Sequence, residues 1–424
     1  MILYLAIFIV ALGLGAPIAL GLGLASIFYL ILTDNLHLML AFPQRILAGV
    51  DNFVLLTIPF FILAGNLMNA ANLTQTIIRM AQLFVGKIRG GLAAINILSS
   101  LMLGGVAGAA TAEAAAIGSV MIPAMKKEGY DPAYAAALTA VGSLAGPLIP
   151  PSLSFIVYGV LTGTSIADLF LAGILPAIVL CGLLFLYALW KGQRESHPVY
   201  SAEPGTRIGR TLFDALPALL LPVLIVGGIR SGAFTPTEAA IIACFYALFA
   251  GMVIYRSLSM RRVFDCIYDA ATMSAGIMLV IGMASMSAFV LGIENVPVTV
   301  ARAMVSLTDS PVMLIIIVNV VLLFFGLFPE PMAALILAMP ILSALMPVIG
   351  IDPVQFGVMI VLNLMIGMIT PPVGLVLFIV SGISRTPLTA VVRAILPMLV
   401  ICVGVLLMVA FVPALSLTVP QMFH

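Results

Sequence analysis

Long apolar stretches separated by short polar segments follow one another along almost the whole of this 424-residue chain. A helix needs about 20 apolar residues to cross a hydrocarbon core of about 30 Å, and most of the stretches reach that length. The sequence lacks the period-two alternation typical of membrane β-barrels. The pattern therefore predicts an all-α polytopic membrane protein. The expected membrane segments are residues 3–32, 51–72, 90–125, 132–163, 167–190, 211–229, 235–255, 270–292, 312–346, 353–382 and 387–416.

Two of these segments, 90–125 and 312–346, are too long for a single crossing and contain helix breakers near their middle. The breakers are Gly104, Gly105 and Gly108 in the first segment and Gly326, Pro329 and Pro331 in the second. We expect each segment to form a re-entrant helical hairpin that enters halfway, turns and leaves on the same side. Irregular backbone at membrane depth must be buried in protein or line a cavity, so each turn is expected near a site.

The two halves of the chain repeat one another at an offset of 221 residues. Gly129, Asp131 and Pro132 match Gly350, Asp352 and Pro353, and Gly146 with Pro150-Pro151 matches Gly367 with Pro371-Pro372. Proline cannot continue a regular helix, so the segments 132–163 and 353–382 are predicted to be broken helices. A repeat that carries such breaks inside apolar helices is typical of transporters with a central site. We expect a first repeat over 1–194, a cytoplasmic linker over 195–210 and a second repeat over 211–424.

The positive charges give a topology for these segments. With the linker placed in the cytoplasm, 14 of the 17 Lys and Arg residues fall inside, as the positive-inside rule expects, and Arg45, Arg230 and Arg302 fall outside. An odd number of crossings then separates the two hairpins, which predicts that the halves are inverted relative to each other. By the same symmetry, residues 1–32 should hold two crossings broken near Gly15 to Pro17, although each piece is short for a full span.

Composition narrows the function classes. Apolar residues make up 63% of the chain and charged residues 8%, with a mean hydropathy of +1.29, a balance that no soluble domain tolerates. The net charge of +1 argues against nucleic acid as a partner and leaves the lipid bilayer as the main environment. The sequence has no GxSxG, HExxH or P-loop motif, so we expect neither an enzyme nor a bound cofactor.

The two helix breaks are the candidate sites for ions and substrate. Carbonyl ends and hydroxyl groups at a break favour a cation, whereas free N–H ends favour an anion. We expect each hairpin tip to close a cation-sized cage against the break of its own half, with substrate between the tips. Kinks used only for packing are the alternative. The candidate cation residues are Gly104, Gly105, Gly108, Ser143, Gly146, Gly326, Asn363, Gly367 and Thr370. The candidate substrate residues are Thr111, Ser152, Ser154, Pro150, Pro151, Pro371 and Pro372.

Acidic residues inside the apolar segments are further candidates. Glu113 and Glu330 occupy equivalent membrane-embedded positions and could relay protons. Both also fall in the predicted first turn of a helix, where a carboxylate can cap free N–H groups instead. Glu238 follows Thr235 and Pro236 in the pattern of a full capping box. Asp131 and Asp352, each before a proline, are expected to be helix N-caps.

At these residues the chain resembles the large membrane subunit of tripartite ATP-independent periplasmic (TRAP) transporters, over essentially its whole length. The segments that carry the resemblance are Asp51 to Met68 (DNFVLLTIPFFILAGNLM), Gly228 to Ala240 (GIRSGAFTPTEAA), Gly350 to Gly357 (GIDPVQFG) and Thr370 to Gly374 (TPPVG). The resemblance implies an elevator-type secondary transporter of the ion-transporter superfamily, in which a mobile transport domain slides against a fixed scaffold.

The resemblance also implies partners and a coupling ion. It implies Na⁺-driven import of an organic acid, such as a sialic acid or a dicarboxylate, across the inner membrane of a bacterium or archaeon. A soluble periplasmic binding protein would deliver the substrate, with the outer loops at 33–50, 293–311 and 346–352 as the expected contact surface. A small four-helix membrane subunit of the Q type, either separate or fused, would complete the system. The alternative left open is a stand-alone H⁺-coupled organic-anion carrier that uses Glu113 and Glu330.

Overall fold

The computed structural model describes residues 2–85, 88–197, 199, 208–308 and 310–423, which form helices and short connections. The first half contains α1 (Ile2–Gly13), α2 (Ile18–Leu32), η1 (Leu36–Ala41), α3 (Phe42–Val50), η2 (Phe53–Leu56), α4 (Thr57–Ala70), α5 (Leu73–Val85), α6 (Gly91–Ala107), α7 (Ala110–Lys127), α8 (Pro132–Gly142), η3 (Ser143–Leu148), α9 (Leu153–Thr162) and α10 (Ile166–Arg194). The second half contains α11 (Ile208–Arg230), α12 (Pro236–Phe249), η4 (Ala250–Ile254), α13 (Met260–Ile293), α14 (Val296–Leu307), α15 (Pro311–Phe325), α16 (Pro331–Ile349), α17 (Pro353–Gly367), α18 (Leu375–Ser384), α19 (Leu388–Phe411) and α20 (Ala414–Met422).

The helix boundaries repeat as the sequence motifs do. Adding 221 to the first residue of each of the five helices α6 to α10 gives the first residue of α15 to α19, to within one residue in every case. The pairs α6–α7 and α15–α16 are the two helical hairpins, and α8–η3–α9 and α17–α18 are the two broken helices. The first broken helix bends by 43° at its interruption. Helix pairs and helix breaks are therefore present at the predicted positions.

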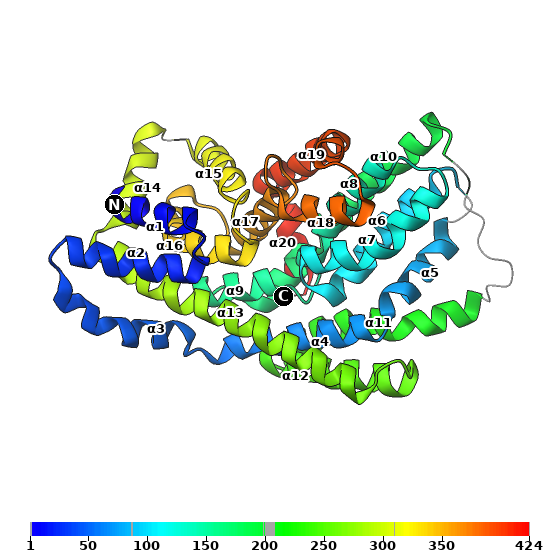
Figure 1. The fold of residues 1–424 in the computed structure, drawn as a ribbon, viewed down its shortest axis with the longest axis horizontal. Helices are drawn as coiled ribbons and strands as arrows, with labels where there is room; N and C mark the ends of the chain where they lie inside the picture. Colours follow the sequence, from blue (N-terminus) through cyan, green and yellow to red (C-terminus); the bar gives the residue numbers. More distant parts are fainter. Residues whose placement is uncertain (1, 86–87, 198, 200–207, 309, 424) are drawn as a thin grey trace.

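Equivalent elements of the two halves run in opposite directions. The pair α3–α4 matches α13 in the repeat, and both α3 and α4 pack against α13. In Figure 1 the chain enters α3 at the left and leaves α4 at the right, whereas α13 begins at the right and ends at the left beside α14.

Among the described residues, seven helices are long and apolar enough to cross a membrane, or eight if the first broken helix counts as one span.

The helix caps at Asp131, Asp352 and Glu238 have the predicted chemistry. Asp131 accepts a hydrogen bond from the Ala133 amide at 3.0 Å, and Asp352 accepts one from the Val354 amide at 2.8 Å. Glu238 accepts a hydrogen bond from the Thr235 amide at 2.8 Å, which completes the capping box. These bonds satisfy helix N-terminal amides that no intrahelical partner can reach. The cap at each broken helix thus fixes where its first half begins.

Four of the observed helices were either not predicted from the apolar pattern or predicted with other bounds. Residues 73–85 and 296–307, expected as connections, are α5 and α14, and the expected outer loop 33–50 contains α3. The last expected span, 387–416, ends at 411, and α20 follows it as a separate helix. In α5 the polar positions Gln75, Arg79 and Gln82 recur at helical spacing on one face, while the opposite face is buried. A search for continuous apolar runs misses such amphipathic helices because every turn carries a polar residue.

The N-terminal segment is divided as the internal symmetry requires. The helices α1 and α2 are separated at residues 14–17 and pack against each other. They contain 12 and 15 residues, which correspond to rises of only about 18 and 22 Å. The predicted break is present, and both pieces are short for a full crossing.

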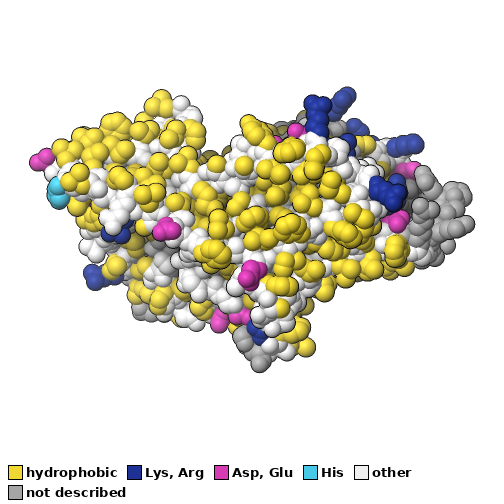
Figure 2. Space-filling model, turned by 90° about the horizontal axis from the view of Figure 1, so that it is seen from below, with side chains coloured by type: hydrophobic (Ala, Val, Ile, Leu, Met, Phe, Trp, Pro, Cys, Tyr) yellow, Lys and Arg dark blue, Asp and Glu magenta, His cyan; other side chains and the backbone are white. Residues whose placement is uncertain are grey.

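The outer surface is apolar over a broad area. Figure 2 shows a face covered largely by hydrophobic side chains, with Lys and Arg gathered toward one end. Large side chains such as Phe213 and Val400 are 70% and 72% exposed. Surfaces of this extent are stable only against lipid or another apolar partner.

The start of the expected linker 195–210 is anchored to the first half. His197 is buried and stacks on Tyr130, with ring centroids 4.3 Å apart, and its Nε2 lies 3.2 Å from Glu195. Its amide donates to the Gly192 carbonyl at 2.9 Å. Residues 198 and 200–207 of the linker, and the basic residues Lys87 and Arg207 of the charge count, lie outside the described part of the chain.

The anchor is expected to loosen at mildly acidic pH. Burial lowers the pKa of His197, although Glu195 opposes the shift. Protonation of His197 is therefore less favourable when the side chain is docked than when it is released into solvent. Docking is fully favoured above the usual histidine pKa of about 6.5 and weakens as the pH falls below that value. Hydrogen-exchange protection of the His197 amide should fall between pH 7.5 and 5.5 in the wild type and stay constant in His197→Gln. Constant protection in the wild type would refute the interpretation.

Candidate functional site

The first hairpin tip lies directly on the first helix break. A methyl group added at Gly104 would lie 3.1 Å from the Gly146 Cα, and one added at Gly105 would lie 2.8 Å from the Pro150 carbonyl oxygen. Gly108 follows the end of α6 and has a φ of +62°. A methyl group added at Gly108 would lie 3.1 Å from the Pro151 carbonyl oxygen. Only glycine permits this approach of backbone to backbone together with the left-handed turn. The tip thus presents its backbone to two carbonyl groups of the break.

The second tip contacts the second break in the equivalent way. A methyl group added at Gly367 would lie 2.7 Å from both the carbonyl carbon and the oxygen of Gly326, closer than any real contact. Gly367 is the repeat partner of Gly146, and Gly326 occupies the tip as Gly104 and Gly105 do. In both breaks the Pro–Pro peptide bond is cis. Each hairpin is therefore closed on the broken helix of its own half, as the sequence predicted.

Glu113 does not cap its helix. Its side chain is fully buried, and neither carboxyl oxygen has a hydrogen-bond partner among the described residues. The carboxylate instead fills the space beside Gly146, where a methyl group would collide with Oε2. The nearby Ser100 hydroxyl also lacks a partner. The capping interpretation is wrong for Glu113 because its side chain points across to the break instead of back to the α7 amides.

Glu330, in contrast to Glu113, caps its helix. Its Oε2 accepts hydrogen bonds from the Met332 and Ala333 amides at 3.0 and 3.2 Å. The expected equivalence of the two acids is wrong, because at the offset of 221 residues Glu330 matches the N-cap Ala109, whereas Glu113 is the fourth residue of α7. Glu330 is already satisfied by the first turn of α16, whereas neither carboxyl oxygen of Glu113 has a hydrogen-bond partner among the described residues.

The polar candidates near the breaks make local bonds. Ser143 donates to the Ala140 carbonyl at 2.8 Å, and Thr370 donates to the Ile366 carbonyl at 2.7 Å. Asn363 donates to both the backbone and the side-chain oxygen of Asn319 at 2.9 and 2.8 Å, which ties α17 to the hairpin helix α15. Its own carbonyl oxygen Oδ1 has no partner among the described residues. All three side chains keep acceptor oxygens that could contribute to a cation site.

A cavity of about 470 Å³ lies where the two tips meet the helices α2 and α13. Its walls come from the first tip and break, from the second tip and break, from the start of α2 and from the middle of α13. Thr111 and Ser154, two of the candidate substrate residues, line it, together with Glu330. Ser152 instead donates to the Pro147 carbonyl as part of the α9 cap, and Pro150, Pro151, Pro371 and Pro372 do not line the cavity.

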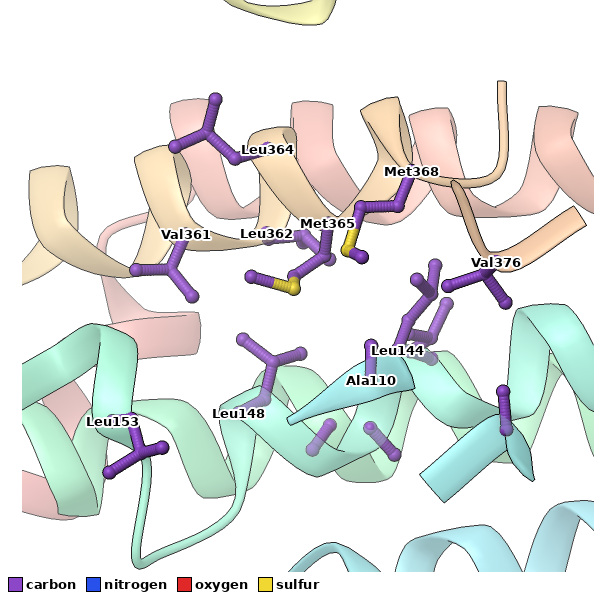
Figure 3. Close-up of a cluster of buried hydrophobic side chains, with 14 of the residues drawn as sticks. Ala110, Leu144, Leu148, Leu153, Val361, Leu362, Leu364, Met365, Met368 and Val376 are labelled. Carbon is purple, nitrogen blue, oxygen red and sulfur yellow. The ribbon is translucent and has the colours of Figure 1, made fainter. Parts of the chain in front are cut away.

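An apolar layer separates the two breaks. Figure 3 shows Met365 of α17 and Met368, the residue after α17, pointing toward Leu144 and Leu148 of η3, with Ala110 of the first tip beside them. Met365 and Met368 also line the cavity, as does Thr272 of α13. The sequence pattern did not single out these residues, because methionine in an apolar helix usually fills space and nothing local marks it as a cavity residue.

Comparison with known proteins agrees with this architecture. The family profile of the tripartite ATP-independent periplasmic transporter, DctM component, matches residues 5–415. The sialic acid TRAP transporter large permease protein SiaM of Vibrio cholerae is 37% identical over 409 residues, covering 96% of each chain. The C4-dicarboxylate permease protein DctM of Pseudomonas aeruginosa is 37% identical over 374 residues, covering 88% of this chain and 87% of the relative.

A longer relative and a solved structure extend the comparison. The isethionate TRAP transporter permease protein DctMQ of Oleidesulfovibrio alaskensis is 37% identical over 418 residues, which cover 98% of this chain but 65% of that protein. The crystal structure of the YdaH transporter of Alcanivorax borkumensis has the same fold, with a TM-score of 0.65 at 15% identity over 89% of this chain and 88% of that chain. The chain belongs to the DctM family, and is thus the large multi-pass permease component of a TRAP transporter in the cytoplasmic membrane and not an enzyme.

Proposed function

We propose that this chain imports an organic anion by an elevator mechanism coupled to Na⁺. The observation that carries the proposal is the closure of each hairpin tip on the break of its own half, with one cavity between the two tips and the helices α2 and α13. The hairpins, the broken helices, α10 and α19 would form the moving transport domain. The helices α2 to α4 and α11 to α13 would form the fixed scaffold of an inverted repeat.

The breaks supply the groups that Na⁺ prefers. Na⁺ is a hard cation that binds oxygen, and each break offers carbonyl and side-chain oxygens close to a tip. In the first half these are the carbonyls of Pro150 and Pro151 and the free carboxylate of Glu113. In the second half they include the Asn363 Oδ1 and the Thr370 hydroxyl. An ionised Glu113 would favour a cation in the first cage.

The relatives support an organic acid as substrate. Their names specify sialic acid, C4-dicarboxylates and isethionate, all of which carry an ionised acid group. The cavity borders the starts of α7 and α9, where helix N-termini favour an anion. A periplasmic binding protein would deliver the substrate, as the family name indicates. The longer DctMQ relative supports pairing with a small Q-type membrane subunit.

Uptake into proteoliposomes tests the proposal. The vesicles should contain this chain and its small subunit, with candidate acids added with or without the binding protein, under an imposed Na⁺ or pH gradient. Uptake that requires both Na⁺ and binding protein is expected. Uptake driven by a pH gradient alone, without binding protein, would overturn the proposal in favour of a stand-alone H⁺ carrier. Because Glu330 is engaged as a cap, that alternative would then depend on Glu113.

Loss of a cavity hydroxyl should weaken substrate binding. Ser154→Ala and Thr111→Val each remove one hydroxyl that lines the cavity. A hydrogen bond to a charged group contributes about 1.5–3 kcal/mol, so KM for the acid should rise roughly tenfold or more, with the Na⁺ dependence unchanged. Ser119→Ala is the matched control, since this exposed hydroxyl on α7 bonds only to the Ala116 carbonyl and lies outside the cavity. An unchanged KM in both cavity variants would exclude this part of the site.

A further inference from the structure

A second polar hollow, separate from the transport cavity, lies at the end of the molecule where the charge count places the cytoplasm. It has a volume of about 450 Å³ and lies between the start of α8, the end of α10 and the start of α19. Its polar lining consists of Asp131, Tyr134, Tyr187, Lys191, Thr386 and Arg393. None of these residues has a role in the proposed transport site.

The charged groups of the hollow are mainly donors. Arg393 is exposed and has no ion pair among the described residues. Lys191 lies over the Tyr134 ring, 4.9 Å from its centroid, and also pairs with Glu195 at 2.6 Å. Asp131 is the one acid in the lining, and its Oδ1 is occupied by the Ala133 amide at the start of α8. A guanidinium and an ammonium that line the same hollow favour a ligand with anionic oxygens, above all a phosphate.

The Tyr134 hydroxyl gives independent support for a ligand. The side chain is only 2% exposed and lines the hollow, yet its hydroxyl has no hydrogen-bond partner among the described residues. A buried hydroxyl without a partner is costly, and such groups in folded proteins are usually satisfied by protein, water or ligand. An anionic oxygen held by Lys191 and Arg393 would supply the missing acceptor.

The surroundings indicate where such a phosphate comes from. Along α19 the wall continues from Arg393 to Leu396 and Val400, which are 50% and 72% exposed, and α10 presents Leu186, which is 61% exposed. Apolar side chains one and two turns deeper in the membrane suit acyl chains attached to the phosphate. We infer that this hollow binds the headgroup phosphate of an anionic phospholipid of the cytoplasmic leaflet, with its chains along α10 and α19.

Thermal stabilisation of the full-length chain in detergent tests the inference. The probes are phosphatidylglycerol, phosphatidylethanolamine with the same acyl chains, and inorganic phosphate. Phosphatidylglycerol should raise Tm in the wild type at concentrations about tenfold lower than phosphatidylethanolamine. Arg393→Gln and Tyr134→Phe should each raise the phosphatidylglycerol concentration for half-maximal stabilisation about tenfold. The control Arg261→Gln removes a charge from the exposed start of α13, outside the hollow. It should leave the phosphatidylglycerol concentration for half-maximal stabilisation unchanged.

Each contrary result overturns the inference in a different way. Equal stabilisation by inorganic phosphate would place a soluble phosphate in the hollow instead of a lipid. Wild-type lipid response in both variants would exclude the hollow as the lipid site. Tyr134→Phe keeps the shape of the side chain, so it remains informative if Arg393→Gln fails to fold. A Tyr134→Phe protein that is simply more stable, with an unchanged lipid response, would show that the hydroxyl has no ligand to bind.

Discussion

Gly367→Ala is expected to reduce uptake about 100-fold while the protein still reaches the membrane. The added methyl group would overlap three backbone atoms of Gly326, at 2.7 to 2.9 Å, and no side chain can move aside to relieve the contact. The second tip must therefore shift off its break, and a displacement of about 1 Å at a site can cost about 10²-fold in activity. Uptake per folded molecule, measured in proteoliposomes, checks the result.

Two further substitutions calibrate this prediction. Gly404→Ala adds the same methyl group to an exposed position of α19 where nothing lies within 4 Å, and it should transport like the wild type. Gly146→Ala should have an intermediate effect, because its methyl group meets the end of the Glu113 side chain, which can rotate. Leucine at either Gly146 or Gly367 should abolish uptake. Wild-type uptake by Gly367→Ala would refute the close contact between tip and break.

Glu113→Gln is expected to stabilise the protein without Na⁺ and to weaken its response to Na⁺. Burying the Glu113 carboxyl group costs roughly several kcal/mol at neutral pH, whether it stays ionised or takes up a proton, and glutamine keeps the shape without this cost. The variant should therefore melt at a higher temperature in Na⁺-free buffer. If the carboxylate neutralises the coupling ion, the half-saturating Na⁺ concentration for uptake should rise at least about tenfold. Thermal melts and uptake titrations over a range of Na⁺ concentrations measure both effects.

The same substitution at Glu330 should have the opposite effect on stability. Glu330→Gln weakens a cap that accepts two amides, which typically costs about 1 kcal/mol, so its melting temperature should fall. A Glu113→Gln protein with unchanged Na⁺ dependence but no response to a pH gradient would identify Glu113 as a proton carrier and contradict Na⁺ binding there.

The features that the sequence predicted well are those set by local chemistry. Glycine and proline interrupt helices wherever they lie, and an acid before proline caps the helix that follows, so the hairpins, the breaks and the caps at Asp131 and Asp352 could be placed from the residues alone. The match between the two halves then indicated which tip belongs to which break. Amphipathic α5 and α14 were missed because hydropathy averaged along the chain hides a helix whose faces differ.

The features that the sequence could not predict depend on tertiary approach. The expected match between Glu113 and Glu330 is wrong: the helix starts correspond at an offset of 221, so Glu330 is the N-cap of α16 and matches Ala109, whereas Glu113 is the fourth residue of α7 and packs against Gly146. The same holds for Met365 and Met368, whose place between the two breaks follows from the crossing of α17 over η3. Repetition of sequence thus predicts repetition of backbone, but not of the bonds that each side chain makes.

The amphipathic helices α5 and α14 have a consequence for the membrane itself. Each connects a long scaffold helix to a hairpin, α4 to α6 and α13 to α15, and each has a polar face with an exposed arginine, Arg79 or Arg302. Helices of this kind lie in the plane of the headgroups, one at each surface if the two halves are inverted. The separation of these two connecting helices would then follow the thickness of the bilayer. Hydrophobic mismatch in shorter or longer acyl chains would shift the balance between inward-facing and outward-facing states.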